Sequence, residues 1–346
     1  MKSKYIAWAI APIFLIGCSD YLETPPSVDY GENEVFATRA DAEKLLTTLY
    51  AEGMPYGFCM SSTNTDRRLL SSSTLASACD EGEDVATWAM GNAAWNAGNH
   101  TNTNFPWDED CRFYLRNHTM RVANLILKRI HEVPFDEGDP DFNKRTTGEA
   151  YFMRAMLLWE GVYRYGGMPI VRDVIDPTDF SQRPRNSFSD CIDSILIDCD
   201  RATQYLPDYY TDNAKLGRAT RIAALALKAR VLLYAASPLF NTSTPYMSFP
   251  GHEDLIGYGN YDRERWKKAA DAAKAAIDAA LASGHYKIHN TGNPDKDYED
   301  VWTIPDNEEI ILGNMKYRNF KTTSRPLVAN LPTWAMNKAW GDAGLY

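Results

Sequence analysis

The chain has 346 residues, of which 45% are hydrophobic and 24% charged, and its mean hydropathy is −0.42. These values exclude a polytopic membrane protein and a disordered chain, and the length allows one large domain or two ordinary ones. The formal net charge of −10 argues against a nucleic-acid partner, because no basic surface is available for the phosphate backbone.

The first residues have the layout of a secretory signal peptide. Lys2 and Lys4 precede an apolar stretch, residues 5–16, that is too short to cross a bilayer as a stable helix. The stretch ends in Leu15-Ile16-Gly17-Cys18, which resembles a bacterial lipobox, in which a small residue precedes the cysteine that receives the lipid. The alternative is an ordinary signal peptide that contains a cysteine.

The residues around the expected cleavage site indicate where the protein is held. We expect a signal peptide of residues 1–17, followed by one domain of residues 18–346 that acyl chains on Cys18 tether to a membrane. Asp20 lies just after this cysteine, and an acidic residue there resembles the surface-export signal of Bacteroidetes lipoproteins. The pattern predicts a location at the outer membrane, on its outer face.

Apolar residues recur at helical spacing along most of the chain. The predicted helices cover residues 38–50, 114–130, 146–165, 187–206, 220–236 and 262–283. Residues suited to N-caps or capping boxes open them, namely Thr38, Thr146 with Glu149, Ser187 or Ser189, Thr220 and Asp262. The helix that contains Tyr151–Trp159 is apolar on most faces, so we expect it deep in the bundle.

The fold class follows from these helices. Alanines at close-packing positions resemble those of tetratricopeptide hairpins, although the full repeat signature is absent. Short strand-like pieces are expected at Tyr286–His289 and Ile310–Lys316, with long loops between elements. The sequence therefore predicts a mainly α protein of helical hairpins with a few short strands.

The cysteines other than Cys18 encode neither a disulfide framework nor a zinc site. Five remain, and no two of them form a CxxC pair. Cys191 and Cys199 lie eight positions apart on one predicted helix, which places them too far apart along its axis to bond. We expect them to be small buried hydrophobic residues.

Nine segments occur in the order in which the SusD/RagB family of Bacteroidetes outer-membrane nutrient-binding lipoproteins has similar ones. They are Cys18–Leu22, Val35–Thr38, Cys79–Glu81, Trp107 with Tyr114 and Ala123-Asn124, Glu149–Ala155, Tyr165–Val171, Gly217–Thr220, Ser237–Asn241 and Trp266–Ala270. The resemblance implies a SusD-like, tetratricopeptide-like fold, a glycan ligand and a SusC-like TonB-dependent transporter as partner. Family chains normally continue past a segment like Leu331–Met336, so the resemblance also implies that the C-terminal part of the fold is missing after Tyr346.

Candidate ligand-binding residues lie in the long segment between Gly53 and Asp110, which has no sustained period. Tryptophan can stack on the apolar faces of sugar rings, while amides, carboxylates and guanidinium groups pair with the hydroxyls. The alternative is that the tryptophans pin a loop to the helices, and for Trp107 the family pattern favours packing at a helix start. The candidates are Trp88, Trp95, Asn96, Asn99, Asn102, Asp66, Arg67 and Asp80.

Signals for catalysis or metal binding are weak. The acidic cluster Asp80, Glu81, Glu83 and Asp84 is compatible with a glycoside hydrolase, but a solvated loop or a cation site is the plainer interpretation. His285 and His289 are read as two separate surface histidines, and the sequence contains no HExxH, GxSxG or GxxxxGK motif.

We therefore expect a non-catalytic glycan-binding lipoprotein without cofactor or metal. A surface glycoside hydrolase and a scaffold lipoprotein that binds only protein partners are the alternatives.

Overall fold

A computed structural model describes residues 31–54, 107–176, 178–304 and 306–313, without the side chains of residues 107–115 and 302. The α-helices within these residues are α1 (Glu32–Val35), α2 (Arg39–Gly53), α3 (Trp107–Arg129), α4 (Phe142–Tyr165), α5 (Phe188–Tyr205), α6 (Arg221–Ala236), α7 (Arg263–Ala282) and α8 (Pro294–Thr303). Short 3-10 helices lie at Ile130–Glu132, Asn213–Lys215 and Glu253–Leu255. The prediction of a mainly α chain is confirmed.

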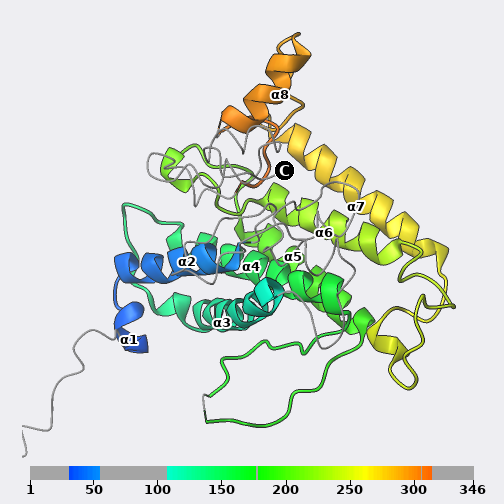
Figure 1. Cartoon of the computed structure of the whole chain (residues 1–346). Helices are drawn as coiled ribbons and strands as arrows, with labels where there is room; N and C mark the ends of the chain where they lie inside the picture. Colours follow the sequence, from blue (N-terminus) through cyan, green and yellow to red (C-terminus); the bar gives the residue numbers. More distant parts are fainter. Residues whose placement is uncertain (1–30, 55–106, 177, 305, 314–346) are drawn as a thin grey trace, which may run out of the picture.

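The helices pack in the order in which they occur, as a series of hairpins. Helix α4 packs between α3 and α5, α6 packs on α5, and α7 packs on α6. Figure 1 shows α1 and α2 at one end of this series and α8 at the other. No helix within the described part of the chain is long and apolar enough to span a bilayer.

Helix α4 lies deep in the bundle, as its apolar sequence predicts. Its side chains separate two hydrophobic clusters, one shared with α2 and α3 around Leu46, Ile126 and Phe152. The other is shared with α5 and α6 and is centred on Trp159 and Phe188. The fold therefore depends on a central helix that is covered on both sides.

Four of the predicted N-cap residues do cap a helix. Thr38, Ser187, Thr220 and Asp262 each accept a hydrogen bond from a backbone N–H in the first turn of α2, α5, α6 and α7. Each bond satisfies a donor that the helix itself leaves unpaired. These local signals were sufficient to place the four helix starts.

The predicted start of α4 at a Thr146 capping box is wrong. The helix begins one turn earlier, at Phe142, because burial of this side chain in the first cluster outweighs the local capping signal. Glu149 does not cap the helix but is fully buried, with carboxylate oxygens 3.4 Å from Arg145 Nε and 3.2 Å from Arg218 Nη1. Burial raises the pKa of Glu149, which the two guanidinium groups oppose.

Cys191 and Cys199 are both free and fully buried, as expected. Cys191 sits where α5 meets the segment after α4, and its Sγ donates to the carbonyl oxygen of Met168 at 3.3 Å. Burial raises the pKa of both thiols. Both residues therefore act as small core side chains.

The short strands expected after α7 are absent from the described residues. Tyr286–His289 is extended, but one backbone hydrogen bond, from Lys287 N to Glu308 O at 3.1 Å, joins it to the residues that follow α8. Carboxylate side chains bind the histidine that ends this piece, so no ladder of backbone bonds develops. The second expected strand, Ile310–Lys316, is also not a strand up to Gly313, and its last residues lie outside the described part.

Candidate ligand-binding site

The sequence-predicted ligand residues lie outside the described residues. This holds for the eight candidates Trp88, Trp95, Asn96, Asn99, Asn102, Asp66, Arg67 and Asp80, for the other members of the acidic cluster and for Cys18. They stay predictions. The structure does place the two ends of the segment that carries the eight candidates, because it leaves after Met54 and rejoins at Trp107, the first residue of α3.

The first of these ends lies against the middle of α4. A Cβ atom built on Gly53 would lie 2.7 Å from Met153 Cε and 3.6 Å from Leu157 Cδ2. The glycine at the last position of α2 permits this close approach, because a larger residue would push aside the end of the Met153 side chain. The segment therefore starts beside Leu157, which also lines a pocket in the described part of the chain.

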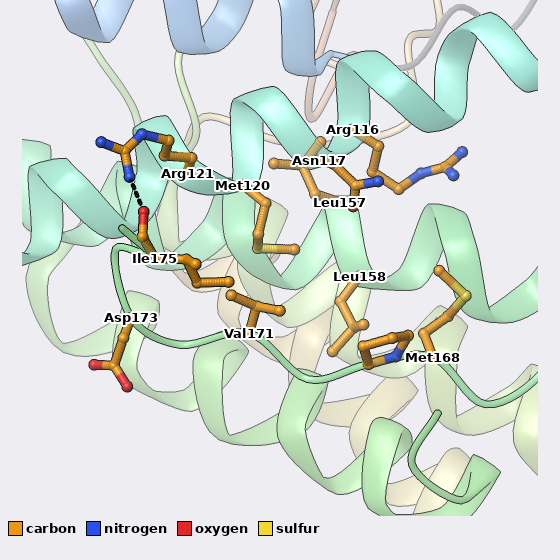
Figure 2. Close-up of a pocket in the computed structure, with 11 residues that line it drawn as sticks. Arg116, Asn117, Met120, Arg121, Leu157, Leu158, Met168, Val171, Asp173 and Ile175 are labelled. Atoms are coloured by element: carbon orange, nitrogen blue, oxygen red, sulfur yellow. Dashed lines mark hydrogen bonds between the residues drawn. The ribbon is translucent and has the colours of Figure 1, made fainter. Parts of the chain in front are cut away.

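That pocket lies between α3, α4 and an extended stretch that we call the wall, residues 168–175 (Figure 2). Its volume is about 270 Å³. Its lining consists of Arg116, Asn117, Met120, Arg121, Leu157, Leu158, Met168, Pro169, Val171, Asp173 and Ile175. In Figure 2, Val171 and Ile175 point toward Met120, whereas the Asp173 carboxylate turns away from them.

The wall has no regular secondary structure, yet side chains from α3 hold its backbone. Asn124 Nδ2 donates to the carbonyl oxygens of Val171 and Asp173 at 3.1 and 3.2 Å. Arg121 Nη1 donates to the carbonyl oxygen of Ile175 at 2.7 Å. These three bonds satisfy alternate carbonyls and fix an extended chain without a neighbouring strand.

Two glycines bring the chain from the end of α4 into the wall. Gly166 has φ of +76°, and a Cβ atom there would lie 2.1 Å from Leu255 O. A Cβ atom on Gly167 would lie 2.1 Å from Asn186 O, and its N–H donates to Leu255 O at 2.7 Å. Any side chain at either position would displace the backbone that it meets. The two glycines of the Tyr165–Val171 segment are thus explained by the path of the chain into the wall.

A buried group of charges, which we call the inner cluster, supports Asn124. Arg154 binds Asp198 through Nε and Nη2, both at 2.8 Å, and donates from Nη1 to Asn124 Oδ1 at 3.0 Å. Arg172 of the wall also reaches Asp198, at 3.1 Å, and Ser194 Oγ, at 2.7 Å. The Arg154 and Asp198 side chains are 6% and 3% exposed, so the pair is protected from water.

Sequence reasoning missed the inner cluster, although one signal was present. Arg154 interrupts the apolar run of α4, and a charged residue in such a run is buried only when it is paired. Its partner on α5 is 44 positions away, which no local pattern reveals.

A second group of charges, the outer cluster, lies around α8, away from the central helices. His289 Nε2 is 3.0 Å from Asp300 Oδ2, and His289 Nδ1 is 3.1 Å from Glu308 Oε1. These hydrogen bonds raise the pKa of the imidazole. Lys296 Nζ also binds Asp300, at 2.8 Å, and Lys287 Nζ lies 3.6 Å from Glu308.

The expectation of two separate surface histidines needs correction for one of them. The His289 side chain is only 12% exposed, because the two carboxylates enclose it, whereas His285 stacks on Tyr209 with ring centroids 4.8 Å apart. Within the described residues, no group of three histidine, cysteine or carboxylate side chains is arranged to hold a metal ion.

Comparison with known proteins identifies relatives. A model of the SusD-like family, described as "Starch-binding associating with outer membrane", matches residues 20–233. No curated protein sequence matches the chain.

Several solved structures share the fold. A SusD-like protein from Bacteroides fragilis is 23% identical with a TM-score of 0.55, over 82% of this chain and 45% of its own. A SusD-like carbohydrate binding protein from Bacteroides vulgatus is 17% identical with a TM-score of 0.54, over 80% and 51%. A putative sugar binding protein from Bacteroides vulgatus is 20% identical with a TM-score of 0.51, over 75% and 50%. The chain thus spans about half the length of these proteins.

Proposed function

Since the chain belongs to the SusD-like family, we propose that it is a non-catalytic lipoprotein of the outer membrane that binds glycan nutrients. The observation that carries this proposal is the family match over residues 20–233, whose description names starch binding and the outer membrane. The fold shared with a protein described as a SusD-like carbohydrate binding protein adds support.

We place the glycan on the segment between Gly53 and Trp107. In this proposal Trp88 and Trp95 stack on sugar rings, and the amides of Asn96, Asn99 and Asn102, together with Asp66, Arg67 and Asp80, pair with hydroxyls. The start of this segment at Gly53, beside the pocket residue Leu157, supports this placement.

The proposal extends to the anchor and the partner. Removal of residues 1–17 and acylation of Cys18 would hold residues 18–346 at the membrane surface, as the lipobox-like sequence predicts. The captured glycan would then pass to a SusC-like TonB-dependent barrel that the protein covers as a lid. The family resemblance supports this partner.

The test is binding of the purified chain from Ser19 to Tyr346 to an array of plant, fungal, host and bacterial polysaccharides. Circular dichroism first establishes that the protein is folded. Binding to one polysaccharide class without release of shorter products supports the proposal and names the ligand. Turnover of the bound polysaccharide would instead support the glycoside hydrolase, and a folded protein that binds none would contradict glycan binding.

A variant sharpens this test at one residue. Trp95→Ala should weaken glycan binding and leave the thermal unfolding midpoint nearly unchanged, because a stacking platform is exposed before it binds. A loss of several kcal/mol of stability would show that Trp95 belongs to the core.

A further inference from the structure

The pocket beside α3 has an interior that does not suit a sugar ring. The side chains that meet there are Met120, Leu157, Leu158, Val171 and Ile175, as Figure 2 shows. A hydroxyl group that contacts only these side chains loses its hydrogen bonds to water and finds no replacement among them, which costs free energy. An apolar substituent on a sugar would be favoured at the same place, because its transfer from water is favourable.

The size of the pocket limits what it can hold. Its volume of about 270 Å³ is slightly below the range of about 300–1,000 Å³ that is typical of small-molecule pockets. A single substituent or one sugar unit fits this volume, whereas a glycan chain does not. The hydrogen-bonded wall leaves little room for the pocket to widen, because Asn124 and Arg121 fix the backbone on that side.

One polar side chain among the described lining residues has no described partner. Asn117 of α3 is exposed and lies at the rim of the pocket, and no hydrogen bond joins its amide to another described residue. The two arginines of the lining are already engaged, Arg121 with Ile175 O at 2.7 Å and with Glu32 Oε1 at 3.2 Å. Among the described lining residues, the pocket therefore offers an amide donor and acceptor above an apolar floor, and both arginines are engaged elsewhere.

We propose that this pocket binds the acetamido group of an N-acetylhexosamine unit. Its methyl group would lie on Met120, Leu158 and Val171, and its C=O would accept a hydrogen bond from the NH₂ of the Asn117 amide. The proposal rests on the proposed glycan-binding function and adds a class of sugar and a site to it.

A pair of matched trisaccharides tests this directly. Triacetylchitotriose and cellotriose have the same linkage and differ at C2, where the first carries an acetamido group and the second a hydroxyl. We expect the purified protein to bind triacetylchitotriose at least about tenfold more tightly in calorimetry, from one buried methyl group and one amide hydrogen bond.

Two variants test whether the preference for triacetylchitotriose comes from this pocket. Val171→Phe fills the pocket while its backbone carbonyl remains available to Asn124, and Asn117→Leu replaces the amide by an apolar group with the same number and branching of heavy atoms. Each should lower triacetylchitotriose affinity by about tenfold, toward that of cellotriose, with cellotriose binding unchanged. Ile197→Phe, at an exposed position of α5, is the matched control and should change neither. Circular dichroism confirms that all three variants fold.

Each other outcome overturns the inference in a recognisable way. Equal affinity for the two trisaccharides, or a preference that survives both pocket variants, contradicts the acetamido site. If the protein binds another polysaccharide but neither trisaccharide, the acetamido site is contradicted and the proposed function stands. If it binds no carbohydrate at all, the acetamido site and the proposed function are both contradicted. Trileucine binding that Val171→Phe abolishes would assign the pocket to peptides.

Discussion

The inner and outer clusters use carboxylates in the same way but give them different cations. Asp198 is bound by Arg154, and a guanidinium is a donor-only group that proteins do not deprotonate. Asp300 and Glu308 enclose His289, whose ring can donate from both nitrogens only when it is protonated. The neutral ring would present a lone pair to one carboxylate. The cation of the inner cluster therefore keeps its charge, whereas the support that the outer cluster gives to α8 depends on pH.

The largest effect is expected at the inner cluster. Asp198→Asn leaves Arg154 and Arg172 without their carboxylate in a buried site, which should lower the free energy of unfolding by about 3–5 kcal/mol. Urea denaturation monitored by circular dichroism measures this loss. The matched control is Asp200→Asn on the same helix, where the carboxylate is 52% exposed beside Lys228 and the loss should stay below about 1 kcal/mol. Equal losses would show that the inner cluster has no special role.

A smaller effect is expected where the chain enters the wall that the inner cluster supports. Gly251→Ala is the control, because a Cβ atom there meets no atom within 4 Å while φ is +78°. This substitution should lower the free energy of unfolding by about 1 kcal/mol. Gly166→Ala has a similar φ and also meets the Leu255 carbonyl, which should add about 1–3 kcal/mol. The same denaturation measurement gives both values. Indistinguishable losses would mean that this contact relaxes without cost.

The smallest and most local effect is expected at the outer cluster. The raised pKa of His289 means that its contribution to stability is fully present below the unfolded-state value of about 6.5 and is lost as the pH rises through the folded-state pKa. NMR titration of the His289 ring should therefore give a pKa above that value. Amide exchange in α8 should accelerate once the ring is neutral, beyond the ordinary base-catalysed increase measured in α5.

His289→Gln tests the origin of this pH dependence. A glutamine amide can donate to one carboxylate at every pH, so the additional acceleration in α8 should disappear. An unchanged pH dependence in this variant would assign the effect to another group of the cluster, such as Lys296, which also binds Asp300.

The sequence predicted those features that depend on neighbouring residues. Thr38, Ser187, Thr220 and Asp262 cap their helices through bonds within one turn, and the apolar run of α4 indicated its central position. The capping-box pattern at Thr146 was misleading because burial of Phe142, a tertiary effect, set the start of the helix.

The pocket could not be predicted, because its parts meet only in the fold. Asn124 binds the wall 47 and 49 positions further along the chain, and Arg154 and Asp198 are 44 positions apart. The wall itself has no periodic signal, since its hydrogen-bond partners are side chains of a helix and not a neighbouring strand. The predicted ligand residues between Gly53 and Trp107 stay predictions, outside the described residues.

The way in which the wall is held determines which of its residues can be substituted without moving its backbone. Asn124 and Arg121 bind the main-chain oxygens of Val171, Asp173 and Ile175, atoms that every residue type possesses. Substitution of the side chains at these three positions therefore leaves the path of the backbone in place. The side chains that line the pocket on this side can therefore change without loss of the hydrogen bonds that hold the backbone.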